Sequence, residues 1–143
     1  MDLALDEARA AGARGEVPVG AVLAGPDGSV LARSGNRTRE LNDPTAHAEI
    51  LVIRSACAAL GVERLMSHHL YVTLEPCAMC ATAISHARIG RLYFGAEDQK
   101  SGGIRQGPRI FAHPQCHHVP DVYEGIGAEA SSALLRDFFR ERR

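Results

Sequence analysis

The spacing of apolar residues along the chain predicts alternating helices and strands. Apolar positions recur every three to four residues in stretches that predict helices at residues 3–13, 45–60, 77–86 and 128–140. Apolar and β-branched runs bounded by Gly or Pro predict strands at residues 17–24, 29–34, 69–74, 89–95 and 117–123. The apolar stripe of the second helix is formed by Ile50, Ile53, Cys57 and Leu60. We therefore expect Cys57 to be a packed core thiol.

The order of these elements predicts an α/β fold. Helices that alternate with strands favour a three-layer α/β/α sandwich around a mixed five-stranded sheet. The Gly-Pro-Asp-Gly turn at 25–28 joins the first two strands into one antiparallel pair. The later strands, joined through helices, are expected to be parallel with right-handed crossovers. A length of 143 residues fits a single domain spanning residues 1–143.

Composition narrows the class of protein only slightly. With 45% hydrophobic and 23% charged residues the chain is ordinary for a globular protein. No apolar run approaches the ~20 residues that a membrane helix needs, so no membrane partner is expected. The acidic amino-terminal segment has the wrong charge for a secretory signal, which predicts a cytoplasmic protein. In that compartment the four cysteines favour metal binding over disulfides.

The distribution of charge is more informative than the net charge of −1. Residues 84–118 hold five basic and two acidic residues, and the last eight residues contain four arginines. Fifteen of the sixteen basic residues are arginine, a side chain suited to phosphate contacts and base stacking. The same enrichment also fits a genome that favours arginine codons, so charge alone leaves RNA binding open.

Two short segments carry the candidate chemistry, and each opens a predicted helix. In the first, His47 is followed two residues later by Glu49; in the second, Pro76 precedes a Cys-x-x-Cys pair. Cys77 and Cys80 face one side of a helical turn, near an amino terminus that lowers thiol pKa values. One imidazole and two thiolates leave a fourth zinc position for water, which zinc converts to hydroxide. Glu49 then moves protons as a non-ligand, which matches the known signature of zinc deaminases.

Other interpretations of these residues are weaker. A Cys-x-x-Cys pair can be a redox pair or half of a structural zinc site, but the accompanying His-x-Glu motif favours catalytic zinc. A second conceivable metal site consists of His113, Cys116, His117 and His118. Adjacent side chains of an extended segment point to opposite faces, which argues against that second site.

On these motifs the chain resembles the bacterial tRNA-specific adenosine deaminases, within the cytidine and deoxycytidylate deaminase superfamily. That family converts the wobble adenosine of an anticodon to inosine. The blocks that carry the resemblance are residues 16–23, 36–37, 43–50, 70–80, 86–91, 94–96, 98, 100 and 138–140. The segments 101–109 and 115–118 depart from the family pattern.

The resemblance implies a cytidine-deaminase-like sandwich that works as a homodimer with one Zn²⁺ per subunit. The implied zinc ligands are His47, Cys77 and Cys80. Glu49 is implied as the proton shuttle. The implied substrate contacts are Asn36, Pro76 and Asp98. The implied substrate is a tRNA anticodon stem-loop, in which a splayed base can enter a pocket that a stacked base cannot reach.

Two competing functions remain. A deaminase of a free nucleobase or nucleoside, such as guanine, cytosine or cytidine, would carry the same zinc motif, so the motif does not separate it from an RNA editor. The basic stretch 84–118 and the arginine-rich end favour RNA. A non-catalytic zinc-binding or tRNA-binding subunit is expected to lose the proton shuttle, whereas Glu49 is present.

Overall fold

A five-stranded mixed sheet organises the structure, a computed structural model that describes residues 1–142. Arg143, part of the arginine-rich end, lies outside the described residues. The strands are β1 (Gly20–Ala24), β2 (Val30–Gly35), β3 (His69–Leu74), β4 (Arg91–Ala96) and β5 (Asp121–Tyr123). Their order is β2-β1-β3-β4-β5. Strand β1 is antiparallel to both β2 and β3, whereas β3, β4 and β5 run parallel.

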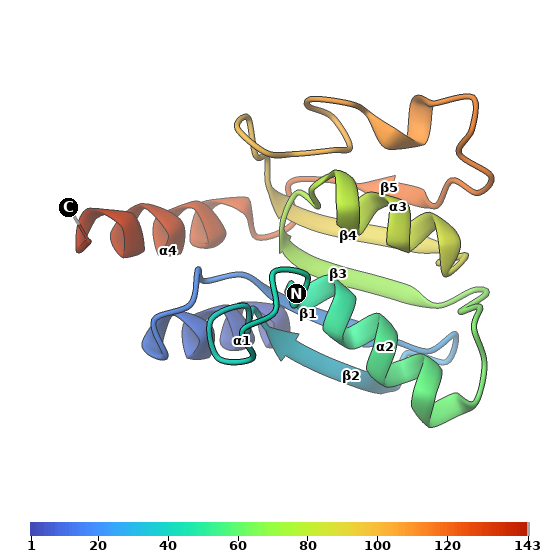
Figure 1. Ribbon diagram of the computed structural model, residues 1–143, viewed down its shortest axis with the longest axis horizontal. Helices are drawn as coiled ribbons and strands as arrows, with labels where there is room; N and C mark the ends of the chain where they lie inside the picture. The colour runs from blue at the N-terminus through green and yellow to red at the C-terminus, as the bar shows by residue number, and fades with distance from the viewer. Residues whose placement is uncertain (143) are drawn as a thin grey trace.

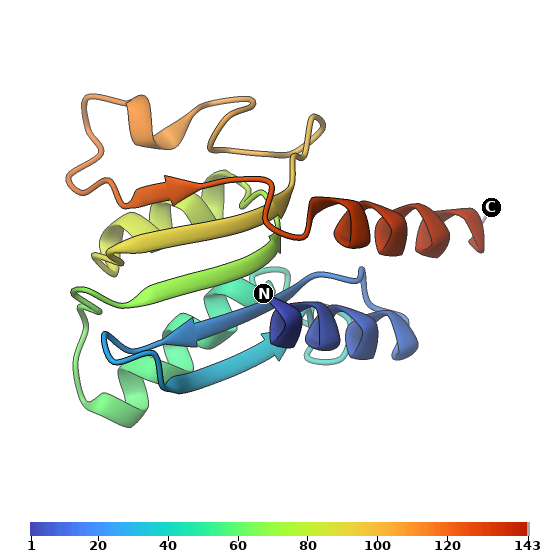
Figure 2. The same ribbon diagram turned by 180° about the vertical axis from the view of Figure 1, so that it is seen from behind.

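Helices cover both faces of this sheet. They are α1 (Asp2–Ala13), α2 (Ala48–Leu60), α3 (Ala78–His86) and α4 (Ala128–Arg140), with a short 3-10 turn, η1 (Ile110–Ala112). Helices α2 and α3 lie over one face (Figure 1), and α1 covers β1 and β2 on the opposite face (Figure 2). Helix α4 contacts α1, β3 and β4 and projects past the end of the sheet. The predicted three-layer sandwich is confirmed. No helix among residues 1–142 is long and apolar enough to cross a membrane.

The main core lies between the sheet and helices α2 and α3. Leu70 of β3 stands in register with Leu92 of β4, and Val72 stands in register with Phe94. All four side chains are fully buried, as alternate positions of strands that share one face should be. This pairing places the carboxyl ends of β3 and β4 side by side, and α3 begins a few residues beyond the end of β3.

Local element boundaries agree with the prediction in part. Strand β3 and helix α4 have the predicted bounds. Strand β1 begins at Gly20 and not at residue 17, because Pro18 has no N–H group to donate to a neighbouring strand. Helix α2 begins at Ala48 and not at residue 45, because His47 has extended backbone (φ −70°, ψ 152°) and is the N-cap. The fifth strand shrinks to three residues.

The structure adds two features to the predicted packing. The hairpin is antiparallel and strands β3, β4 and β5 are parallel, as predicted, but β1 also pairs antiparallel with β3. The large apolar side chains of α2 are not its most buried ones. Leu60 is 46% exposed, and Cys57 packs against the core but is only half-buried. The residues that α2 buries are Ala48, Glu49, Val52 and Ala56. Small side chains on this face let the helix axis lie close to the sheet, which larger ones would prevent.

A buried carboxylate fixes the loop that follows β2. Glu16 is 2% exposed and accepts hydrogen bonds from the backbone N–H of Arg39 (3.2 Å) and Glu40 (2.9 Å) and from the Thr38 hydroxyl (3.4 Å). Burial acts to raise the pKa of Glu16, but these hydrogen bonds outweigh it and hold the pKa below its ordinary value of 4.5. The loop therefore depends on the ionised form of this side chain.

We expect the stability that Glu16 contributes to depend on pH. Its folded-state pKa is depressed, so the contribution is present above about pH 4.5 and is lost as the pH falls through the folded-state pKa. Glu16→Gln should lower the free energy of unfolding by about 1–3 kcal/mol at neutral pH, since hydrogen bonds to a charged acceptor are lost. Urea unfolding of both proteins at neutral and acidic pH measures this. A difference in unfolding free energy between the two proteins that stays constant with pH would contradict this role of Glu16.

Candidate metal centre and its surroundings

Two helix amino termini meet at the carboxyl ends of the strands and carry the candidate ligands. His47 is the N-cap of α2, and Cys77 is the N-cap of α3 with extended backbone (φ −72°, ψ 176°). Cys80 lies in the first turn of α3 and is fully buried. Helix amino termini present free N–H groups and the positive end of the helix dipole, which stabilise thiolates. The local sequence thus places both cysteines at the positive end of a helix dipole.

The three side chains converge to the spacing that zinc requires. The Nδ1 atom of His47 lies 3.7 Å from the Sγ atom of Cys77 and 3.5 Å from that of Cys80. A tetrahedral zinc with ordinary bond lengths separates its nitrogen and sulfur ligands by about 3.6 Å. All three candidate ligand atoms lie within 4.8 Å of one another, and residues 1–142 hold no other such group. The donor set and its spacing therefore fit Zn²⁺ with three protein ligands.

The thiols are electrostatically prepared for a metal. Hydrogen bonds with Cys80, the larger effect, and with His47 together lower the pKa of Cys77 to about 4, against the effect of burial. The same hydrogen bond with Cys77, together with burial, raises the pKa of Cys80. Before a metal binds, ionisation is therefore favoured at Cys77 and disfavoured at Cys80. Metal binding then requires the release of the remaining thiol proton.

Glu49 lies beside this group and has an incomplete set of hydrogen bonds. It is in the first turn of α2 and 4% exposed, and its Oε1 atom has no hydrogen-bond partner among residues 1–142. Burial raises the pKa of Glu49, opposed by the nearby His47. An unpaired buried carboxylate oxygen is costly to the fold, and such atoms mark places where a ligand or reacting group binds. A carboxylate with a raised pKa is suited to take up and return a proton.

The predicted substrate residues are anchored to the ligand-bearing segments. The Oδ1 atom of Asn36 accepts a hydrogen bond from the backbone N–H of Ala48 (2.9 Å), next to His47. Its backbone carbonyl accepts one from Arg14 (3.1 Å). The carbonyl of Pro76, directly before Cys77, accepts one from the N–H of Gly103 (2.8 Å).

Asp98 is occupied mainly with its own loop. Its Oδ1 atom accepts from the backbone N–H groups of Lys100 (3.1 Å) and Ser101 (3.0 Å), which forms a tight turn. Its own N–H donates to Glu75 (3.1 Å). Sequence interpretation missed Glu75, although a carboxylate at the end of a buried strand, directly before the Pro-Cys motif, is an available signal.

The second conceivable metal site does not form. The thiol of Cys116 lies against Ser85 (3.4 Å) and the carbonyl of His118 (3.2 Å), while Nε2 of His118 contacts the Ile89 carbonyl (2.7 Å). Within residues 1–142 these side chains gather no group of three ligand atoms. The segment binds back to the fold through backbone carbonyls and not through a shared ion.

An α/β/α sandwich in which a His-Cys-Cys group adjoins a buried glutamate defines a zinc-dependent deaminase. The family model of the cytidine and deoxycytidylate deaminase zinc-binding region matches residues 1–96. The tRNA-specific adenosine deaminase of Agrobacterium fabrum is 66% identical over 143 residues, covering 100% of this chain and 93% of that protein. That of Rickettsia bellii is 43% identical, covering 100% and 99%. The chain belongs to the tRNA-specific adenosine deaminases of this zinc-binding family.

Solved structures separate this branch from its neighbours. One described as a tRNA:A34 deaminase that edits A to I at the wobble position superposes with a TM-score of 0.93 at 65% identity, covering 94% of this chain and 97% of that one. A guanine deaminase from Bacillus subtilis gives a TM-score of 0.67 at 30% identity, covering 98% and 90%. The shared sandwich extends across the superfamily, whereas the detailed backbone follows the tRNA enzymes.

Removal of one ligand should abolish metal binding. We expect Cys77→Ala to lower the zinc content from about one ion per chain to near zero, since two remaining ligands cannot complete a tetrahedral site. Elemental analysis of the purified proteins measures this. Cys57→Ala is the matched control, because that half-buried thiol lies on α2 outside the cluster. Full zinc occupancy in Cys77→Ala would contradict the ligand set.

Proposed function

We propose that this chain, acting as one deaminase domain, hydrolyses the wobble adenosine of a tRNA anticodon loop to inosine. The observation that carries the substrate assignment is 66% identity to a tRNA-specific adenosine deaminase over the whole chain. That identity includes the segment beyond residue 96, outside the part shared by the wider zinc-binding family. Because tRNA is a cytoplasmic RNA in bacteria, the same proposal places the enzyme in the cytoplasm.

The chemistry is divided among four side chains. His47, Cys77 and Cys80 hold one Zn²⁺. When bound, zinc supplies a Lewis acid that lowers the pKa of a water molecule toward ~7. Glu49 would take one proton of the attacking water at its unpartnered Oε1 and give it to the purine ring nitrogen beside the amine, while the water oxygen bonds to C6. Glu49 would then carry the second proton of that oxygen to the amine, and the bond between C6 and the amine breaks, so water and adenosine become inosine and ammonia.

The surroundings of the site fit a nucleoside held in a loop. Asn36 has its side-chain oxygen occupied by Ala48, so its amide NH₂ is the group that can donate to the substrate. Pro76 contributes a buried wall next to Cys77. Asp98 sits on an exposed loop with one carboxylate oxygen engaged in its own turn, and it contacts the RNA near the splayed base.

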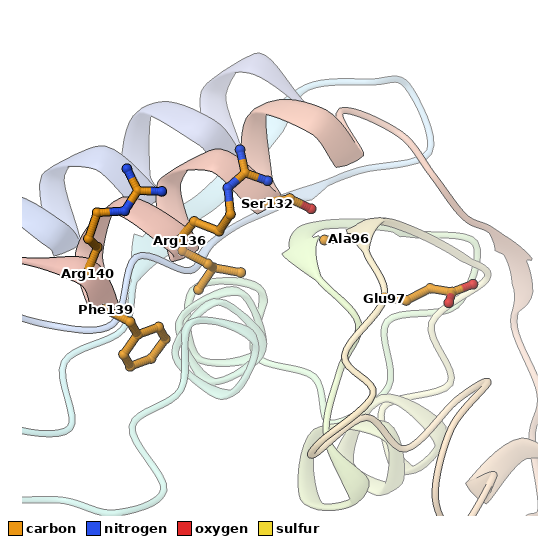
Figure 3. Close-up of a pocket in the computed structure, with 7 residues that line it drawn as sticks. Ala96, Glu97, Ser132, Arg136, Phe139 and Arg140 are labelled. Atoms are coloured by element: carbon orange, nitrogen blue, oxygen red, sulfur yellow. The ribbon is translucent and has the colours of Figure 1, made fainter. Parts of the chain in front are cut away.

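A groove beside the site supplies cationic groups for phosphate. It lies between α4 and the end of β4, and Arg136 and Arg140 project from the helix in Figure 3. The groove includes Ala96, the last residue of β4. The carbonyl of Ala96 accepts a hydrogen bond from the N–H of Glu75 (2.8 Å), two residues before Cys77. Guanidinium groups bind phosphate bidentately, and a stem-loop backbone would lie across this edge.

A deaminase of free bases is the second candidate, because guanine deaminases share the fold. A product assay distinguishes the two. We expect zinc-loaded protein to form inosine in an anticodon stem-loop RNA with a wobble adenosine, and to release no ammonia from free adenosine, guanine, cytosine or cytidine. Ammonia from a free base with unmodified RNA would keep the zinc chemistry and overturn the RNA substrate.

Glu49→Gln is the catalytic control in that assay. Glutamine preserves the volume of the buried side chain but cannot carry the proton, so kcat should fall by about 10²–10⁴-fold. Zinc content should stay unchanged, because Glu49 is not among the clustered ligand atoms. A Glu49→Gln protein that retains both zinc and normal turnover would show that another group moves the protons.

We also assign a homodimer to the working enzyme. On the face covered by α2 and α3, Ile50 and Ile53 remain half-buried, and Leu60 (46%) and Met79 (37%) are exposed. Apolar side chains left exposed or half-buried on two neighbouring helices favour burial against a second copy. Sedimentation equilibrium at micromolar concentration should give the mass of two chains; a single-chain mass throughout would contradict the assignment.

A further inference from the structure

Glu75 is a buried carboxylate whose described partners are all backbone amides. It is 2% exposed, and it precedes Pro76 and the ligand Cys77. Its Oε1 atom accepts from the N–H of Asp98 (3.1 Å). Its Oε2 atom accepts from three consecutive N–H groups, those of Ile104 (3.1 Å), Arg105 (2.8 Å) and Gln106 (3.1 Å). One side chain thus binds both ends of the segment 98–106.

The same segment lies directly against the start of α3. Gly102 forms an isolated bridge with Cys77, and a Cβ atom on Gly102 would lie 2.5 Å from Oε2 of Glu75. A Cβ atom on Gly103 would lie 2.6 Å from the backbone nitrogen of Ala78. Both approaches are possible only for glycine. The Gly-Gly pair in the stretch that departs from the family pattern is therefore what allows this contact.

The segment presents charge outward on the other side. Lys100 and Arg105 are exposed, and Asp98 lies at the first turn. Arg105 pairs with Glu124 at 2.6 Å, which ties the far end of the segment to the residues after β5. The basic side chains are thus carried by a loop whose inner face is held to the zinc-binding segment.

We infer that Glu75 is a positioning residue for RNA binding, which holds the 98–106 segment at a fixed place relative to the zinc ligands. It touches neither the metal cluster nor the substrate in this role. A carboxylate is required because it is acceptor-only: an amide would turn an NH₂ group toward at least one of the four backbone donors. The inference rests on the proposed function, since it names a residue that aligns the RNA-contacting loop with the reacting base.

Glu75→Gln tests this inference. Amide hydrogen exchange at residues 98, 104, 105 and 106 should accelerate, because the segment loses its shared acceptor. The KM for the anticodon stem-loop should rise about tenfold while kcat changes less than about threefold, as expected when ground-state and transition-state binding weaken together. Zinc content should stay at one ion per chain. A purely structural role would lower stability without this split between KM and kcat.

Glu16→Gln is the matched control. Glu16 is also 2% exposed and also accepts backbone N–H groups, but it holds residues 38–40. Asn36 is held independently, through the Val19 carbonyl, Arg14 and Ala48. We expect Glu16→Gln to lose stability with an unchanged KM. An equal rise of KM in both variants, or a fall in kcat alone for Glu75→Gln, would overturn the inference.

Gly102→Ala provides a second route if Glu75→Gln does not fold. The added methyl group would lie 2.5 Å from the Asp98 carbonyl oxygen as well as from Glu75, so it would displace the segment from both. The same rise in KM is expected. Amide exchange needs no substrate, so unchanged exchange in both variants overturns the positioning role alone. Failure of the wild-type protein to edit RNA overturns the proposed function instead.

Discussion

The site depends on the meeting of two helix amino termini at one end of a sheet. His47 and Cys77 are N-caps, and each stands where its helix has unpaired N–H groups and a positive dipole end. Helices α2 and α3 follow β2 and β3, two strands that flank β1 and run in the same direction, and both helices pack on one face of the sheet, so the two caps converge. The Nδ1 atom of His47 therefore lies 3.5–3.7 Å from the two Sγ atoms, and all three candidate ligands are held by helix ends. This placement makes the metal geometry a consequence of the fold.

Three buried glutamates illustrate how hydrogen bonding divides structural from chemical roles. Glu16 and Glu75 are each 2% exposed, and backbone N–H groups satisfy both oxygens of each carboxylate. Glu49 is 4% exposed and has one oxygen with no partner among residues 1–142. Carboxylates whose two oxygens both accept hydrogen bonds hold loops in place. The Oε1 atom of Glu49 remains available as an acceptor for a bound molecule.

The part of the chain that is shared with the wider zinc-binding family ends at β4. The ligand cluster and Glu49 lie within residues 1–96, the part matched by the wider zinc-binding family. The loop after β4 and helix α4 lie beyond it and surround the same edge of the sheet. Guanine deaminases superpose on 96% and 98% of this chain with TM-scores of 0.81 and 0.67, so the backbone is shared beyond that first part as well. Differences in the second part can redirect one mechanism to another substrate.

The sequence by itself determined the features that depend on neighbouring residues. Helical and strand periods predicted β3 and α4 with their observed bounds, and the two short motifs placed the candidate ligands and Glu49 at helix starts. Tertiary structure alone decided the antiparallel pairing of β1 with β3 and the burial of the small-residue face of α2. It also decided which four backbone N–H groups donate hydrogen bonds to Glu75. Periodicity in the sequence shows which residues share a face of a helix or strand. It does not show which apolar face of a helix meets the sheet, or which distant N–H groups a buried carboxylate reaches. Both depend on contacts between segments that lie far apart in the chain.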